Sequence, residues 1–325
     1  MNGSDTARAF WTVARQRGEL RAAALAPAGE DEVMVRTLFS GISRGTERLI
    51  FEGRVPVSEQ GRMRAPFQGG DFPFPVKYGY AAVGVVEAGE AALLGRTVFV
   101  LHPHQDRFVV PAEAARLLPA GLPPRRAVLA ANMETALNGL WDSGAGPGDR
   151  IVVVGGGAVG LLVAHLAGRL PGTETVLVDV DAARAPLARA LGVGFAAPDA
   201  VPSGADVVFH ASASDAGLAT ALAVAGDEAS VVEMSWYGAG AVAAPLGGAF
   251  HAGRLRLISS QVGRISPGRR PRWSYARRLS KALELLEDPR LDALLGQPVP
   301  FAQMPDRMAE LLAGPAPCPV IAYPE

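Results

Sequence analysis

The stretch IVVVGGGAVGLLVAHLAG, residues 151–168, decides the fold that this sequence predicts. A run of β-branched residues typical of a buried strand leads into glycines spaced G-x-G-x-x-G, and an apolar helical run follows. In such a loop Gly155 makes the tight turn, Gly157 lets the backbone approach a pyrophosphate, and Gly160 lets the helix pack closely on the strand. The pyrophosphate would lie at the helix N-terminus, where free N–H groups favour anions, so Ala158 and Val159 are also expected to contact it.

An acidic residue follows at the spacing that such a loop requires. The next predicted strand lies in TVLVDVD, and Asp179 within it stands 19 residues beyond Gly160. A carboxylate there accepts hydrogen bonds from the adenosine 2′-OH and repels a 2′-phosphate, which favours NAD over NADP. Two alternatives stay open: Asp181 as the relevant acid, and a glycine turn in a sheet that binds no nucleotide.

The sequence on either side of this motif predicts two domains of an α/β protein. Residues 126–262 alternate short Val/Ile/Leu runs with helical segments, which is typical of a doubly wound parallel sheet. Residues 1–125 read instead as short strands separated by Gly and Pro. Residues 263–325 are expected to return to that first, β-rich domain.

Composition excludes several classes of protein. Hydrophobic residues make up 49% and charged residues 19% of the chain, and the net charge is -1, so there is no global bias toward nucleic acid or membrane. The start of the chain lacks a charged-then-apolar signal pattern, which predicts a cytoplasmic protein. The single cysteine, Cys318, excludes an internal disulfide and a zinc site built from several thiolates.

The order of these segments resembles the medium-chain dehydrogenase/reductase superfamily, which includes the zinc alcohol dehydrogenases. The matching pieces are SGISRGTE (40–47), YGYAAVGVVEAGE (78–90), METALNGL (133–140) and the glycine-loop half. The resemblance implies a GroES-like catalytic domain beside a Rossmann domain, hydride transfer with a nicotinamide cofactor, a small-molecule substrate and a homodimer.

The departures from that family concern its zinc ligands. Ser43 stands where the zinc enzymes have a cysteine, and Tyr80 and Ala81 stand where they have a His-Glu pair. A further ligand cysteine, expected just before METAL, is missing as well. The resemblance is therefore to a zinc-independent branch. The piece SGISRGTER (40–48) is similar to the branch that contains bacteriochlorophyllide-a dehydrogenase.

The resemblance also implies further cofactor-binding residues. Arg44 matches a pyrophosphate-binding arginine, and Thr135 matches the residue packed against the nicotinamide. The other positions lie where strand ends meet the cofactor: Arg184, Ala211, Ser212, Ser235, Trp236, Ser260 and Gln261.

A carbonyl that receives hydride needs a proton donor, and without zinc a side chain must supply it. His102 falls where the zinc enzymes place a residue lining the substrate pocket. Its ordinary pKa near 6.5 suits proton transfer, so His102 is the predicted acid/base, with Tyr80 or Ser43 holding the oxygen. Tyr80 is the competing proton donor.

Two other interpretations of the histidine pair remain. His102 and His104 are two residues apart on a predicted strand, so their side chains would face the same side. They could coordinate a metal, with Asp71, Glu47 or Glu134 as a third ligand. They could equally be polar side chains at a strand end that hydrogen bond to backbone or water. The prediction is that no metal is bound.

The expected function is that of a zinc-independent, NAD(H)-linked oxidoreductase interconverting an alcohol and a carbonyl. The arginine-rich stretch GRISPGRRPRWSYARR (263–278) suggests an anionic, cyclic substrate, and a solvated basic face or a dimer contact is the alternative. The alternative activities are an NADPH-dependent enone or quinone reductase and a dinucleotide-binding protein without turnover.

Overall fold

The computed structural model describes residues 6–324, and the chain divides into two compact units. The first unit takes the chain up to Ala131, Leu283–Glu287 and everything from Leu295 on; the second takes Asn132–Ala282 and Asp288–Leu294. The chain thus re-enters the first unit at residue 283, whereas the sequence placed that boundary at 263. In the segment before this boundary, Arg278 donates hydrogen bonds to Glu134 Oε1 (2.9 Å) and Asn138 Oδ1 (2.6 Å), which both belong to the second unit.

The first unit is built from two antiparallel-rich sheets, as its Gly- and Pro-punctuated strands predict. One sheet has the order β2-β1-β5-β4 and the other the order β16-β17-β3-β6-β7-β9, with β8 also paired to β3. The strands are β1 (Thr6–Ala14), β2 (Arg17–Ala24), β3 (Glu32–Gly41), β4 (Gly69–Gly70), β5 (Val76–Lys77), β6 (Ala82–Gly89), β7 (Thr97–Val100), β8 (Arg107–Pro111), β9 (Arg116–Leu117), β16 (Val299–Pro300) and β17 (Val320–Ala322). The helices are α1 (Arg44–Phe51), α2 (Pro124–Ala127) and α9 (Met304–Ala313), with 3-10 turns η1 (Val57–Glu59), η2 (Ala112–Ala114) and η5 (Phe301–Gln303).

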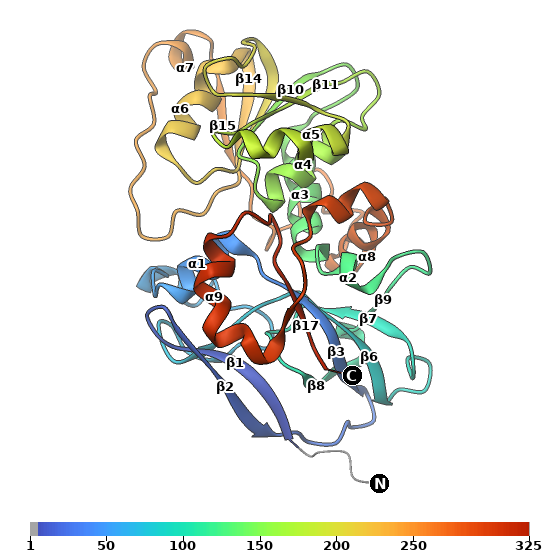
Figure 1. Ribbon diagram of the computed structural model, residues 1–325. Coiled ribbons are helices and arrows are strands. Elements are labelled where there is room, and N and C mark those ends of the chain that lie inside the picture. Colours follow the sequence, from blue (N-terminus) through green and yellow to red (C-terminus); the bar gives the residue numbers. More distant parts are fainter. Residues whose placement is uncertain (1–5, 325) are drawn as a thin grey trace. The chain divides into compact units, whose positions relative to one another are not determined.

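Strand β3 is the centre of the larger sheet. Alternate residues such as Val33 and Val35 are fully buried, and they pack with Val98 and Phe108 in one core. β17 runs antiparallel to β3, so the last strand of the described chain completes the sheet of the first unit. Figure 1 shows β17 beside β3.

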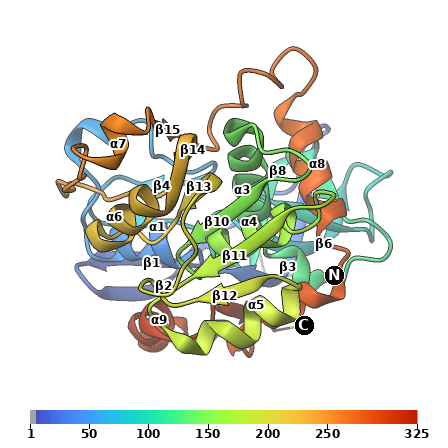
Figure 2. The same ribbon diagram turned by 90° about the horizontal axis from the view of Figure 1, so that it is seen from above.

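The second unit contains a six-stranded parallel sheet of order β12-β11-β10-β13-β14-β15, which confirms the predicted doubly wound fold (Figure 2). Its strands are β10 (Arg150–Val154), β11 (Glu174–Val178), β12 (Gly194–Ala196), β13 (Ala205–His210), β14 (Ala225–Glu233) and β15 (Arg256–Ser259). Its helices are α3 (Ala130–Ser143), α4 (Ala158–Ala167), α5 (Ala185–Leu191), α6 (Asp215–Val224), α7 (Ala249–Ala252) and α8 (Tyr275–Leu285), with η3 (Ala182–Arg184) and η4 (Pro289–Leu294). α3 and α8 each cross the boundary between the units.

The strand order reverses at β10, which lies between β11 and β13. Right-handed crossovers therefore put α4 and α5 on one face of the sheet and α6 on the other. Leu218 and Leu222 of α6 pack on Val152 and Val208 of the sheet. The crevice that binds ligands in such folds lies at the carboxyl ends of the strands beside this reversal, where the glycine loop begins.

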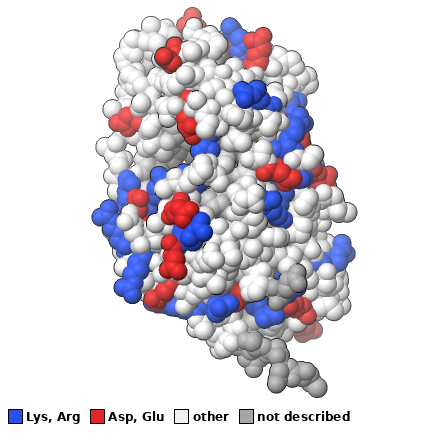
Figure 3. All heavy atoms as spheres, in the orientation of Figure 1, with Lys and Arg blue, Asp and Glu red and all other residues white. Residues whose placement is uncertain are grey.

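No helix within residues 6–324 is both long and apolar enough to cross a bilayer. Acidic and basic side chains are interspersed over the face shown in Figure 3. This mixture agrees with the near-zero net charge of the sequence.

Candidate functional site

The three glycines of the loop after β10 meet three different steric requirements. Gly155 has a φ of +111°, and a Cβ there would stand 2.7 Å from the backbone nitrogen of Ser212. A Cβ at Gly160 would collide with the carbonyl oxygen of Gly155. Gly157, by contrast, has no atom of residues 6–324 within 4 Å of its ideal Cβ position, apart from its chain neighbours and its own helix. Gly155 and Gly160 are thus needed by the fold, while Gly157 borders open space at the N-terminus of α4.

Asp179 lies against this loop. Its Oδ2 accepts a hydrogen bond from the Gly156 N–H (2.5 Å) and its Oδ1 accepts one from the Asp181 N–H (2.8 Å). Asp181 serves its own turn, where it accepts from the Ala183 N–H (3.0 Å) and pairs with Arg184 (3.4 Å). Of the two acids that the sequence offered, Asp179 is the one held beside the glycines.

Other predicted cofactor residues of the second unit take different positions. Ala211 and Ser212 lie against Gly155, as expected for residues at the reversal of the sheet. The Ser260 hydroxyl donates to Asp142 (2.7 Å), and Gln261 Oε1 accepts from the Gly263 N–H (2.6 Å), so both side chains are used locally. The loop-starting residues Ala158 and Val159 open α4, while Thr135 lies on α3 and Ser235 and Trp236 follow β14.

Arg44 belongs to the first unit, at the start of α1. Its guanidinium donates to the carbonyl oxygens of Leu312 (3.0 Å), in the last turn of α9, and of Ala316 (3.1 Å), which follows that helix. These bonds fix the arginine to the C-terminal segment of its own unit.

Ser212 and Ser235, which the sequence predicts at strand ends, belong to a polar cluster at the ends of β13 and β14, whose pairing of His210 with Glu233 the sequence does not predict. His210 is fully buried, with Nδ1 2.7 Å from Glu233 Oε2 and Nε2 2.7 Å from the Ser212 hydroxyl. The Tyr237 hydroxyl donates to Glu233 (3.0 Å). Burial raises the pKa of Glu233, but the hydrogen bond and charge of His210 outweigh burial, and the pKa is lowered overall. A signal existed, because polar residues that end neighbouring parallel strands meet at one edge of the sheet.

The first unit holds a second buried cluster, which centres on His104. Its Nε2 lies 2.9 Å from Glu47 Oε2, and its Nδ1 lies 2.7 Å from the Ser40 hydroxyl. Ser40 in turn hydrogen bonds to the Tyr323 hydroxyl (2.9 Å). One order of donors satisfies all three hydrogen bonds: Tyr323 donates to Ser40, Ser40 donates to His104 Nδ1, and His104 Nε2–H donates to Glu47. His104 and Glu47 are 1% and 3% exposed, so these hydrogen bonds are shielded from water.

Tyr80 is connected to Glu47 through the start of α1. Its hydroxyl hydrogen bonds to the side chains of Ser43 and Thr46, and the Ser43 N–H donates to Glu47 Oε1 (2.8 Å). Burial raises the pKa of Tyr80 to about 12, so this phenol stays protonated at neutral pH. The structure therefore brings two of the predicted catalytic residues, Tyr80 and Ser43, into one hydrogen-bonded group.

His102 takes a different position. It is 4% exposed, its Nδ1–H donates to the Pro103 carbonyl oxygen (2.9 Å), and its ring stacks on Phe108 with centroids 3.7 Å apart. Burial, with the nearby Lys77 charge, lowers its pKa to about 3. At neutral pH the imidazole is therefore uncharged and is a poor proton donor.

The residues weighed as a metal site are spread among other partners. Asp71 pairs with Arg64 (2.6 Å) and is 87% exposed, and Glu134 of the second unit pairs with Arg278 (2.9 Å). Among residues 6–324, His, Cys, Asp and Glu form no group of three or more that could hold a metal.

The low pKa of His102 predicts a pH dependence of stability. The unfolded histidine titrates at 6.5 and the folded one at about 3, so the unfolded chain binds more protons between these values. The stability due to this residue is complete above pH 6.5 and is lost as the pH falls toward 3. We expect the unfolding free energy of His102→Gln to fall less between pH 7 and pH 4 than that of the wild type. Urea unfolding at each pH measures it.

His251→Gln is the control, because His251 is an exposed residue of α7. An unchanged pH slope in His102→Gln would show that burial does not suppress protonation of this ring.

Comparison with known proteins shows which fold this chain shares. No family model matches the chain. A D-guloside 3-dehydrogenase of Escherichia coli is 25% identical over 307 residues, covering 85% of this chain and 87% of that protein. Among solved structures, the L-idonate 5-dehydrogenase of Escherichia coli has a TM-score of 0.80 at 15% identity, with 98% of each chain covered. A thermostable alcohol dehydrogenase from Pyrobaculum aerophilum has a TM-score of 0.78 at 20% identity, covering 98% of this chain and 99% of that one. The chain therefore has the fold of the alcohol dehydrogenases, with a β-rich GroES-like unit and a doubly wound Rossmann unit.

Proposed function

We propose that this protein is a zinc-independent oxidoreductase that uses NAD(H) to interconvert an alcohol and a carbonyl on a sugar-like small molecule. The observation that carries the proposal is the open space at Gly157, at the N-terminus of a helix that follows the first strand of a doubly wound sheet. The backbone angles of Gly157, φ -75° and ψ -179°, can be adopted by any residue, so the fold itself does not require glycine there. Close approach of a dinucleotide to the backbone would explain it.

The residues of the glycine loop fit a dinucleotide. The free N–H groups at the start of α4 would hold the pyrophosphate, and Asp179, which accepts one backbone hydrogen bond at each oxygen, has lone pairs left for ribose hydroxyls. When bound, a nicotinamide supplies the chemistry of hydride exchange with a carbon of the substrate.

Tyr80 is the residue that we assign to the reacting oxygen. A phenol that stays protonated can donate a hydrogen bond to a carbonyl oxygen and so stabilise the charge that develops there. Ser43, Thr46 and the buried Glu47 hold its hydroxyl in place. His102, with a pKa of about 3, is protonated in only about one molecule in ten thousand at pH 7, which argues against it as the acid.

The donor set supports zinc independence. Serine and a protonated phenol are not the thiolate, imidazole or carboxylate ligands that zinc prefers, and Ala81 offers no ligand atom. His104 and Glu47 already satisfy each other. We expect activity to survive dialysis against a strong chelator, with zinc by elemental analysis well below one atom per chain; loss of activity that added zinc restores would contradict this.

The proposed substrate class is supported by the relatives. One of them acts, by its name, on D-gulosides and another on L-idonate. Membership in the branch of bacteriochlorophyllide-a dehydrogenase stays a prediction from residues 40–48 alone.

The test is binding followed by turnover. Calorimetry with NADH and NADPH measures cofactor affinity, and absorbance at the nicotinamide band follows a panel of polyols, sugar acids, glycosides and simple alcohols. We expect NADH to bind more tightly and at least one polyol or sugar to be oxidised. Tight binding with no turnover on the panel would favour a dinucleotide sensor, and NADPH-dependent reduction of enones would favour the alternative reductase.

Asp179 sets the proposed preference for NADH. Asp179→Asn keeps an acceptor for the Gly156 N–H but removes the charge, so we expect the ratio of NADPH to NADH affinity to rise about tenfold or more. Asp181→Asn is the matched control and should leave the ratio unchanged. A larger change in the control would assign the ribose to Asp181.

We also propose a cytoplasmic homodimer. β15 is the end strand of the six-stranded sheet, and Leu257 on it is 41% exposed, which leaves an edge that a second copy could cover. Sedimentation velocity at micromolar concentration measures the state, and a monomer would contradict the proposal.

A further inference from the structure

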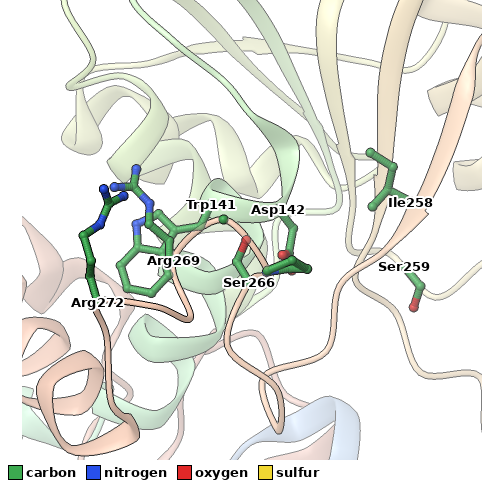
Figure 4. A pocket seen from close by; sticks show the side chains of 9 residues that line it. Trp141, Asp142, Ile258, Ser259, Ser266, Arg269 and Arg272 are labelled. Atoms are coloured by element: carbon green, nitrogen blue, oxygen red, sulfur yellow. The ribbon is translucent and has the colours of Figure 1, made fainter.

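A hollow of about 650 Å³ opens in the second unit between the end of α3 and the loop that follows β15. We call it the Trp141 hollow (Figure 4). The residues lining it are Trp141, Asp142, Ile258, Ser259, Ser266, Pro267, Gly268, Arg269 and Arg272. Its size suits a small organic ligand. Ile258 and Ser259 end β15, so the hollow includes a strand end on the carboxyl edge of the sheet, where ligands of this fold bind.

Two arginines of the hollow have unused donors. Among residues 6–324, neither Arg269 nor Arg272 donates a side-chain hydrogen bond or forms an ion pair. Their neighbours differ: Arg270 donates to the Ile265 carbonyl oxygen (3.3 Å), Arg277 to that of Arg272 (2.6 Å), and Arg278 to Glu134 (2.9 Å). Three guanidinium groups of the arginine-rich segment are thus bonded within the second unit, and these two remain at the hollow.

Trp141 positions one of the free guanidinium groups. Arg269 lies over its indole ring, 5.5 Å from the centroid, and Trp273 packs against the same indole at 4.7 Å. Stacking restrains a guanidinium without using its N–H groups, so less entropy is lost when those groups bind a ligand.

The other polar side chains of the Trp141 hollow can hydrogen bond to hydroxyl groups of a ligand. Asp142 Oδ2 accepts hydrogen bonds from Asn138 (3.0 Å) and Ser260 (2.7 Å), which holds the carboxylate in place and leaves Oδ1 as an acceptor. Ser259 and Ser266 also line the hollow. Asp142 would repel a ligand that carries only negative charge. A ligand with both an anionic group and hydroxyl donors could pair with the arginines and donate to Asp142.

We propose that the Trp141 hollow is a binding site for a hydroxylated anion, that is, a sugar acid or a phosphorylated sugar, whose carboxylate or phosphate pairs with Arg269 and Arg272 and whose hydroxyl donates to Asp142. That such an anion is also the substrate rests on the proposed function; the binding site itself does not.

The test is calorimetry on the whole protein without cofactor, with gluconate, 6-phosphogluconate, glucose and inorganic phosphate as probes. We expect saturable binding of gluconate or 6-phosphogluconate that is tighter than that of glucose or phosphate and weakens with added salt. Arg269→Gln and Arg272→Gln should each weaken it about tenfold or more. Arg189→Gln, an exposed arginine of α5 in the same unit, is the control and should bind like the wild type.

Three results would overturn the proposal. The first is no saturable binding of either hydroxylated anion at millimolar concentration. The second is binding that Arg269→Gln and Arg272→Gln leave unchanged. The third is dissociation of an oligomer in Arg272→Gln by sedimentation, which would make the hollow a contact between copies of the chain. NADH affinity, measured on the same samples, separates the two claims: anion binding with no NADH binding would keep this inference and remove the proposed function.

Discussion

Tyr80→Phe is expected to lower kcat/KM by about a hundredfold or more, with NADH affinity unchanged. The change removes one hydroxyl, whose pKa of about 12 keeps it a hydrogen-bond donor, from a half-buried side chain that hydrogen bonds to Ser43 and Thr46. The donor would be missing where negative charge develops on the substrate oxygen. Steady-state kinetics with the best substrate of the panel, and NADH titration by fluorescence, measure the two quantities.

Tyr78→Phe is the matched control, because Tyr78 is buried and its ring meets that of Tyr80 edge-on, 6.0 Å away. In the described part of the chain, its hydroxyl makes a single long hydrogen bond, of 3.5 Å, to the Met63 carbonyl oxygen. We expect it to retain activity within a few-fold. If Tyr80→Phe behaves like Tyr78→Phe, Tyr80 is not the proton donor.

The high pKa of Tyr80 also fixes the shape of the pH profile. In the proposed role the protonated phenol is the active form for carbonyl reduction, and with a pKa of about 12 it keeps its proton through the neutral range. A loss of reduction rate between pH 5 and pH 8 would therefore have to come from another residue.

The parts of the site that the sequence predicts are those set by local spacing. Gly155, Gly157, Gly160 and Asp179 lie on one loop and the strand beside it, so their separation in the chain almost determines their separation in space. The doubly wound sheet follows for the same reason, because each strand and the helix after it are neighbours in the sequence.

The parts that escaped prediction depend on pairings between distant residues. Glu47 and His104 are 57 positions apart and meet because α1 and the segment after β7 both contact β1. No local pattern distinguishes His104, which is tied to a carboxylate, from His102, which stacks on Phe108. The ion pair between Arg278 and Glu134 likewise joins residues 144 positions apart.

Gly157→Val is expected to weaken NADH binding by about a hundredfold while leaving the fold intact. Gly157 has extended backbone angles, φ -75° and ψ -179°, which a β-branched residue adopts easily, and its ideal Cβ meets no more distant part of the described chain within 4 Å. The new side chain would therefore fill only the space through which a pyrophosphate must approach the N–H groups of α4. A change in unfolding free energy of no more than about 1 kcal/mol is expected, since glycine caps a helix only modestly.

Gly160→Ala makes the opposite prediction, and the pair separates a binding requirement from a folding one. Its methyl group would meet the carbonyl oxygen of Gly155, which is backbone and cannot rotate away, so the variant should lose both thermal stability and NADH affinity. Gly157→Val should lose affinity alone. Calorimetry with NADH and thermal unfolding of both variants measure the two effects. Wild-type NADH affinity in Gly157→Val would mean that the dinucleotide does not lie on this loop, and the whole assignment of the second unit as a cofactor domain would fall with it.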